Sequence, residues 1–264
     1  MGDSRTAEPR RLLALETSGK SGSVAVATSR SDGSVAIEQE VLDPAWGSAR
    51  TLAPAISRLL DRLGLAPPML QAIAVVQGPG SFTGLRVGAA TAKTMAWAIG
   101  IPLVAVDALD CVARQVARSV ARAKPDAPKT LVVAADAYRG QVFWGEYRWN
   151  GIGVATVQPT GIEAIETVAR RCTRSQERIM LAGPGAGRVL TWLEDQGSAS
   201  SHAWIQVLQG PESIPMAEMV AELGWERWEL GATEEIMGFL PHYYRGSAAE
   251  EKKKGSGSGG SDRR

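Results

Sequence analysis

The sequence predicts an α/β protein made of two similar subdomains of β-β-β-α-β-α type that face each other across a cleft. Residues 12–106 alternate strand-like and helix-like patterns in the order β-β-β-α-β-α-β. Two landmarks then recur in the same order, namely an acid that ends an apolar strand (Glu16, then Asp136) and a Gly-Pro-Gly turn (78–80, then 183–185). These matches indicate a duplicated unit; a chance likeness of two α/β stretches is the alternative.

In the first half, strands are expected at 12–15, 24–27, 35–42, 72–77 and 101–106, with helices at 48–65 and from Thr83 to Ile99. The first two strands flank the turn-rich ETSGKSGS and form a hairpin. The first helix carries apolar residues at three- and four-residue spacing, and Pro67-Pro68 ends it. The continuously apolar AIAVVQ (72–77) is typical of a buried parallel strand.

The second half repeats this pattern. Residues 131–149 have a strand, an acid, a glycine-containing turn and a second strand, and residues 178–194 have a strand, Gly-Pro-Gly and a helix. We therefore expect four segments: a flexible N-terminus (1–10), an N-terminal subdomain (11–108), a C-terminal subdomain (109–246) and a disordered low-complexity tail (247–264).

Composition narrows the function classes. Without residues 247–264 the chain holds 24 basic and 25 acidic side chains, so its body lacks the excess of cations needed to grip RNA alone. No run of about 18 apolar residues occurs, and the opening MGDSRTAEPRR has no apolar signal core, so we expect a cytoplasmic protein without a membrane span. Cys111 and Cys172 are expected as buried thiols.

The glycine-rich loop QGPGSFTGLRVG (77–88) fits neither common phosphate-binding pattern. No lysine follows its glycines as in a Walker loop, and the spacing of Gly78, Gly80 and Gly84 is one residue too long for a dinucleotide fingerprint. Ser81 or Thr83 is expected to cap the following helix. That helix has many small side chains, which favours either a docking face for another helix or close packing on its own sheet.

Two acidic hairpins and two histidines limit the chemistry. Glu16-Thr17-Ser18 resembles the first phosphate hairpin of the superfamily of actin and the sugar kinases, whereas Tyr138 and Arg139 after Asp136 are too bulky for a second one. We therefore interpret Glu16, Thr17, Ser18 and Asp136 as a vestigial nucleotide site, with Asp136 as a turn residue. The histidines 202 and 242 form no H-x-x-x-H pair, so neither a metal site nor a catalytic triad is expected.

Four segments resemble one family: LLALETSGKSGSVAV, AIAVVQGPGSFTGLRVGAATAKTMAWAIGIPLVAVDAL, AADAYRGQVFWGEY and PHYYR. Together they span about residues 11–245 in the order of the bacterial TsaB (YeaZ) family. The resemblance implies a duplicated actin-like (ASKHA, ribonuclease H-like) fold and a non-catalytic paralogue of TsaD. It further implies a scaffold or activator that acts with TsaD, TsaE and TsaC-type proteins in N6-threonylcarbamoylation of the tRNA adenosine next to the anticodon.

The resemblance also implies the partners and the surface. TsaD is the main partner and TsaE a second one; the chain is a homodimer when alone and meets tRNA only through the complex. No cofactor of its own is expected, with ATP or ADP only at a partner interface. The partner-binding helices would be Ser48–Leu63 and Thr83–Ile99, with the following residues at the interface: Leu52, Ile56, Leu59, Gly80, Ser81, Thr83, Arg86, Ala89, Ala90, Lys93 and Trp97.

Two positions depart from the family pattern. Glu16 stands where many members have aspartate, and Gly47-Ser48 stand near a position where many have histidine. Two other functions stay open on the residues alone. An actin-like ATP-dependent small-molecule kinase is suggested by the paired acidic hairpins, and a peptidase by older naming of relatives.

Overall fold

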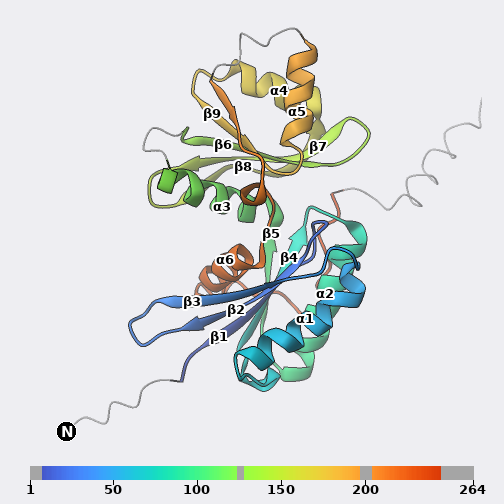
Figure 1. Cartoon of the computed structure of the whole chain (residues 1–264), viewed down its shortest axis with the longest axis vertical. Coiled ribbons are helices and arrows are strands. Elements are labelled where there is room, and N and C mark those ends of the chain that lie inside the picture. The colour runs from blue at the N-terminus through green and yellow to red at the C-terminus, as the bar shows by residue number, and fades with distance from the viewer. Residues whose placement is uncertain (1–7, 124–127, 197–203, 245–264) are drawn as a thin grey trace, which may run out of the picture.

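The computed structural model describes residues 8–123, 128–196 and 204–244. It contains two five-stranded sheets of identical topology, with strand orders β3-β2-β1-β4-β5 and β8-β7-β6-β9-β10. In each sheet the first three strands pair antiparallel and the last two join in parallel. The predicted α/β fold with a duplicated unit is therefore confirmed (Figure 1).

The first half contains β1 (Arg11–Glu16), β2 (Ser23–Ser29), β3 (Val35–Val41), α1 (Ser48–Arg62), η1 (Pro67–Met69), β4 (Ala72–Gly78), α2 (Phe82–Ile99), β5 (Leu103–Asp107) and α3 (Ala108–Ala123). The second half contains β6 (Thr130–Asp136), β7 (Gln141–Trp149), β8 (Val154–Ala164), α4 (Ile165–Arg174), β9 (Ile179–Ala182), α5 (Ala186–Asp195), β10 (Ile205–Val207), η3 (Pro211–Ser213) and α6 (Ala217–Glu229). The elements named from the sequence lie within three residues of these bounds.

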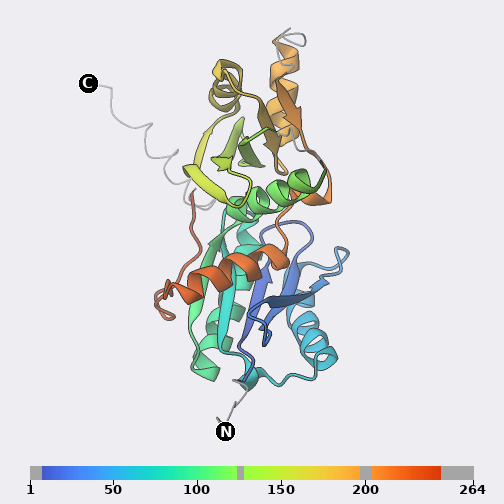
Figure 2. The ribbon, with the colours of Figure 1, turned by 90° about the vertical axis from the view of Figure 1, so that its left-hand side faces the viewer.

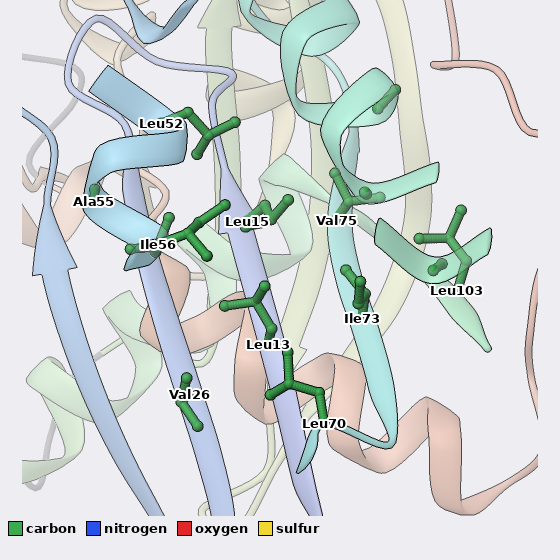
Figure 3. Packing of buried hydrophobic residues seen from close by; sticks show 14 of the residues in the cluster. Leu13, Leu15, Val26, Leu52, Ala55, Ile56, Leu70, Ile73, Val75 and Leu103 are labelled. Atoms are coloured by element: carbon green, nitrogen blue, oxygen red, sulfur yellow. The ribbon is translucent and has the colours of Figure 1, made fainter. Parts of the chain in front are cut away.

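The central strands of the first sheet, β1 and β4, are buried on both faces, as their continuously apolar sequences predict. On one face, α1 and α2 cover a cluster that includes Leu13, Leu15 and Ile73, and α1 contributes Leu52 and Ile56 to it (Figure 3). On the other face, the alternate residues of the same strands contact α6. The strands β1 and β4 therefore have no solvent-facing side.

The third helix of each half packs on the sheet of the other half. Helix α3 follows β5 of the first sheet, yet its Val112 and Val116 lie against Leu131 of the second sheet. Helix α6 follows β10 of the second sheet, yet it packs on the first sheet, where a Cβ at Gly224 would overlap that of Ala74. A division at residue 108/109 follows the chain but not the packing, because segment 109–246 supplies α6 to the core of the first half.

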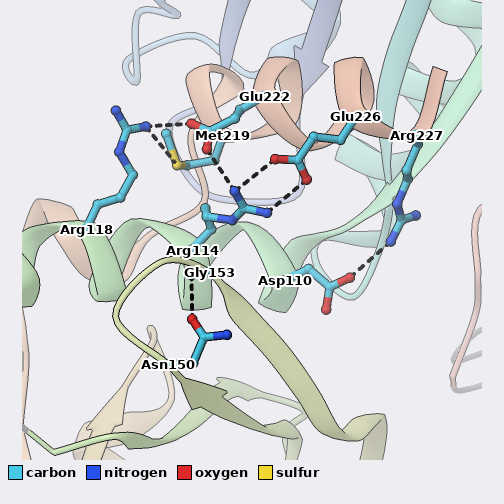
Figure 4. A network of polar contacts seen from close by, with 9 residues as sticks. All are labelled: Asp110, Arg114, Arg118, Asn150, Gly153, Met219, Glu222, Glu226 and Arg227. Carbon is cyan, nitrogen blue, oxygen red and sulfur yellow. Dashed lines mark hydrogen bonds and ion pairs between the residues drawn. The ribbon is translucent and has the colours of Figure 1, made fainter. Parts of the chain in front are cut away.

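The two exchanged helices meet along a charged seam. Arg114 of α3 pairs with Glu222 and Glu226 of α6 at 3.0 and 2.9 Å, and Arg118 pairs with Glu222 at 2.6 Å (Figure 4). Arg227 of α6 donates to Asp110 of α3 at 3.1 Å. These ion pairs join the halves; Arg114 and Glu222 are the more shielded members, at 18% and 26% side-chain exposure, whereas Glu226 is 48% exposed.

We expect Arg114→Met to destabilise the fold by about 1–3 kcal/mol, because it leaves Glu226 without its cation and Glu222 with Arg118 alone. The matched control is Arg170→Met, which removes the surface pair with Glu166 on α4, where both side chains are more than half exposed. That change should cost less than about 0.5 kcal/mol. Urea unfolding measures both, and equal losses would contradict a structural role for the seam.

The described residues contain no helix that is both long and apolar enough to cross a membrane. Cys111 and Cys172 are free and buried, as expected. His202 and residues 247–264 lie outside the described residues, so the predictions for them are not addressed.

Candidate functional site

The first hairpin turn is closed by its own acid. Glu16, the last residue of β1, is fully buried, and its Oε1 accepts the backbone N–H of Ser18 at 2.6 Å and also the Ser18 hydroxyl. In a phosphate hairpin these donors would face the ligand. Here the carboxylate occupies them, so the turn lacks the free N–H of Ser18 that anion binding would use.

The environment of Glu16 is unusual for a carboxylate. Its Oε2 is buried without a hydrogen-bond partner. Burial raises the pKa of Glu16 to about 7, against the opposing effect of the hydrogen bonds from Ser18 and Gly19. A substantial fraction of Glu16 is therefore neutral near pH 7.

The glycine-rich loop is shaped to receive this hairpin. A Cβ at Gly84 would overlap the carbonyl oxygen of Thr17, and one at Gly88 would overlap the Thr17 hydroxyl. A Cβ at Gly80 would lie 2.6 Å from the carbonyl oxygen of Ser18. The Thr17 hydroxyl donates to the carbonyl of Gly84 at 2.8 Å. The glycines thus permit contact between two parts of the protein backbone.

The N-terminus of α2 is capped by a residue of the chain itself. Ser81 is its N-cap and accepts the N–H of Gly84 at 3.3 Å, so of the two predicted capping residues only Ser81 has this role. The N–H of Ser81 donates to the carbonyl of Ser18 at 2.8 Å. The start of α2 therefore contacts the backbone of the first hairpin, at the position where a phosphate-binding loop would contact its ligand. This agrees with the spacing of the glycines, which does not match a phosphate-binding pattern.

A segment from the C-terminal end of the described chain covers the other side of the loop. We call residues 232–244 the C-terminal strap. The N–H of His242 donates to the carbonyl of Gln77 at 2.7 Å, and a Cβ at Gly78 would lie 2.9 Å from the carbonyl oxygen of His242. Gly78 also has a φ of 140°, which disfavours any other residue. The strap and the first hairpin therefore contact the glycine-rich loop at two different points, while Gly80 and Ser81 remain exposed.

The second hairpin keeps its acid but not an open turn. Asp136 Oδ1 accepts the N–H of Tyr138 at 2.8 Å and pairs with Arg188 of α5. Tyr138 and Arg139 both have positive φ, at 61° and 51°. Asp136 thus has the geometry of a turn residue. Among the described residues, no three His, Cys, Asp or Glu side chains are grouped so as to hold a metal ion.

A third acid at a strand end was missed by the sequence analysis. Asp107, the last residue of β5, accepts the N–H of Leu109 at 2.8 Å and the hydroxyls of Thr160 at 2.9 Å and Tyr244 at 3.1 Å. Burial, and then repulsion from Asp110, raises the pKa of Asp107 to about 6. Its signal was present in PLVAVDAL, an acid that directly follows a buried apolar run, as at Glu16.

The structure corrects several of the residues assigned to the partner surface. Leu52, Ile56, Leu59 and Ala89 are buried in the core of the first half, where they hold α1 and α2 on the sheet. Gly80 is exposed, although a Cβ there would overlap Ser18, so its assignment to the partner surface stays a prediction. Residues in the core cannot contact a partner unless the protein unfolds locally.

Two further residues of that set interact with the strap. Lys93 Nζ donates to the carbonyls of Met237 and Phe239 at 2.8 and 2.9 Å. Arg86 Nε donates to the Tyr243 hydroxyl at 3.2 Å, although its side chain is exposed. Their contacts within the chain indicate a structural role.

The remaining residues leave an exposed line along α2. Thr83, Ala90 and Trp97 are exposed and spaced seven residues apart, and Thr94 lies between the last two. Trp97 is 68% exposed, which is high for so large an apolar side chain. We call these four residues the α2 stripe. Its other face, with Ala92 and Ala96, is buried against the sheet, so close packing on its own sheet, one of the two alternatives, is confirmed for that face.

Two halves of one topology, each with an acid at the end of its first strand, define an actin-like protein. A family model described as "TsaD: tRNA N6-adenosine threonylcarbamoyltransferase" matches residues 14–185. The chain is 29% identical to the tRNA threonylcarbamoyladenosine biosynthesis protein TsaB of Escherichia coli, over 93% of this chain and 99% of that protein. It is 28% identical to TsaB of Bacillus subtilis, over 75% of this chain and 80% of that protein.

Solved structures agree with these relatives. YeaZ from Pseudomonas aeruginosa superposes with a TM-score of 0.64 at 26% identity, covering 89% of this chain and 99% of that one. A second structure from that organism, described as similar to peptidase YEAZ, gives a TM-score of 0.65 at 26% identity. The chain belongs to the family that the TsaD model describes, and its relatives place it in the TsaB (YeaZ) branch.

Proposed function

We propose that the chain takes part in the biosynthesis of threonylcarbamoyladenosine in tRNA as a non-catalytic subunit that supports a TsaD-type partner. The names of its TsaB relatives support the process. The observation that supports the non-catalytic role is the closed first hairpin. An actin-like enzyme would offer the hydrogen-bond donors of this turn to phosphate, whereas here Glu16 accepts the Ser18 N–H and the glycine-rich loop packs against the turn.

The proposal includes the partners. A TsaD homologue is the main one, a TsaE homologue joins the complex, and a TsaC-type synthase supplies the activated group. The chain meets tRNA only within that complex, forms a homodimer when alone, and holds ATP or ADP only at a partner interface. The α2 stripe supports this arrangement, since small residues beside an exposed tryptophan permit close approach of another helix.

Reconstitution tests the function. TsaC-, TsaD- and TsaE-type proteins with tRNA should form threonylcarbamoyladenosine efficiently only when this chain is added. Full modification without it would overturn the proposal. Turnover of ATP and a small-molecule acceptor by the chain alone, lost in Asp136→Asn, would instead favour the kinase hypothesis.

We expect Ala90→Arg to abolish binding to the TsaD-type partner, because a long charged side chain in the middle of the α2 stripe prevents close helix packing. Arginine at the buried Ala89 would test folding and not docking. The matched control is Thr191→Arg, on the exposed face of α5 in the other half, which should bind as the unaltered chain does. Titration calorimetry measures both, and unchanged affinity in Ala90→Arg contradicts the assignment of the stripe.

A further inference from the structure

The C-terminal strap (232–244) contacts β5, the glycine-rich loop and α2 of the first half, and its last residue contacts the second half. It leaves the end of α6, runs along the side of the first half and reaches the second half (Figure 2). Its N-terminal part covers the open edge of the first sheet, where the N–H of Glu234 donates to the carbonyl of Leu103 in β5 at 2.8 Å.

The middle of the strap is fixed to α2. Phe239 is buried in the core of the first half. The Lys93 ammonium of α2 donates to the carbonyl of Phe239 itself and to that of Met237, two residues earlier. Hydrogen bonds from a charged donor are stronger than neutral ones, so Lys93 holds the strap along the flank of α2.

The next part of the strap contacts the start of α2. Besides the contacts of His242 with Gln77 and Gly78, the ring of Tyr243 lies 5.2 Å from that of Phe82, the first residue of α2. Arg86 stacks over Phe82 at 4.0 Å and donates to the Tyr243 hydroxyl. The strap therefore touches α2 at its first turn and again two turns later.

The end of the strap contacts the second half. The Tyr244 hydroxyl donates to Asp107, which also accepts the hydroxyl of Thr160 from β8. The Tyr244 ring lies 5.6 Å from that of Phe143 in β7 and stacks on His242 at 4.2 Å. One residue thus joins the end of β5 to two strands of the second sheet.

We propose that the C-terminal strap is a mechanical tie that couples the position of the second half to that of α2. A shift of the second sheet moves the groups around Tyr244, and the adjacent residues 242 and 243 carry that shift to the first turn of α2. The α2 stripe lies on the same helix, so any partner bound there would sense the relative position of the halves. The inference concerns the chain alone and does not depend on the identity of the partner.

A double-mutant cycle tests the coupling. Lys93→Met removes the anchor on α2 but keeps an unbranched apolar stem, and Tyr244→Phe removes only the hydroxyl that contacts Asp107. Each should raise the unfolding equilibrium constant about tenfold, since each removes hydrogen bonds that involve a charged group. Independent distant sites combine multiplicatively to within about twofold. If the unfolding equilibrium constant of the double variant departs more than twofold from the value expected from the product of the two single effects, the tie is supported. If it agrees with that value to within twofold, the proposal is overturned.

Hydrogen exchange gives a second readout. In Tyr244→Phe, peptides that cover the first turn of α2 (81–88) should exchange severalfold faster, although that residue does not touch them. Lys129→Met and Tyr138→Phe are the matched controls, since both side chains are exposed and lie outside the strap. If Tyr244→Phe does not fold, Phe143→Leu replaces it, because it changes the ring that Tyr244 contacts in the second half and leaves residues 81–88 untouched. Unchanged exchange over 81–88 in every folded variant of this contact overturns the proposal.

Discussion

Replacing Gly84 with alanine should destabilise the protein by at least about 3 kcal/mol, at the upper end of what overpacking of a core costs. The added methyl group would overlap the carbonyl oxygen of Thr17, which is main chain and cannot rotate away. The same hairpin turn carries the buried Glu16 and the hydroxyl of Thr17 that donates to Gly84. Relief therefore requires moving either the first turn of α2 or the end of β1.

The matched control for Gly84→Ala is Gly187→Ala. Gly187 lies in the first turn of α5, the helix of the second half that corresponds to α2, and a Cβ there would meet only the Gln209 amide at 3.5 Å. Alanine should stabilise this site by up to about 1 kcal/mol through its better helix propensity. Urea unfolding distinguishes the two outcomes. Equal and small effects at both sites would show that the loop does not receive the hairpin as described.

The glycine-rich loop shows how far sequence reasoning extends. The spacing of the glycines and the missing lysine excluded both phosphate-binding patterns, and the local sequence predicted a structural loop with Ser81 or Thr83 as the helix cap, since these features depend on local geometry. What the loop contacts was not predictable. Gly78 meets His242, a residue more than 160 positions away, and no local pattern reports such a pair.

The residues assigned to α1 show the opposite error. Leu52, Ile56 and Leu59 recur at helical spacing, and that spacing marks the face of a helix that packs on its own sheet. The prediction assigned these residues to a partner surface because they lie on α1, although only the opposite, exposed face of that helix can contact a partner. The exchange of α3 and α6 between halves was also missed, because a helix with one apolar face does not specify which of two similar sheets it covers.

The stability of the protein should fall as the pH rises from 5 to 8, and Glu16 should account for most of the loss above pH 6. Burial raises the pKa of Glu16 from 4.5 to about 7 and that of Asp107 from 3.8 to about 6. Each group binds its proton more tightly in the folded state. The stability that each group contributes is fully present below the pKa of that group in the unfolded chain. It is lost as the pH rises through the pKa of the group in the folded protein.

For Glu16 the shift corresponds to roughly 3 kcal/mol in total, of which about 1–1.5 kcal/mol is lost between pH 6 and 8. Glu16→Gln removes this titration while its amide oxygen can still accept the N–H of Ser18. The measurement is the free energy of unfolding in urea at pH 6 and 8, compared as a difference so that the absolute stability of each variant cancels. Glu163→Gln, at an exposed site on β8, is the matched control and should keep the loss of the unaltered chain. The same loss in Glu16→Gln would mean that Glu16 is ionised throughout this range, and the closed hairpin would then hold a buried charge.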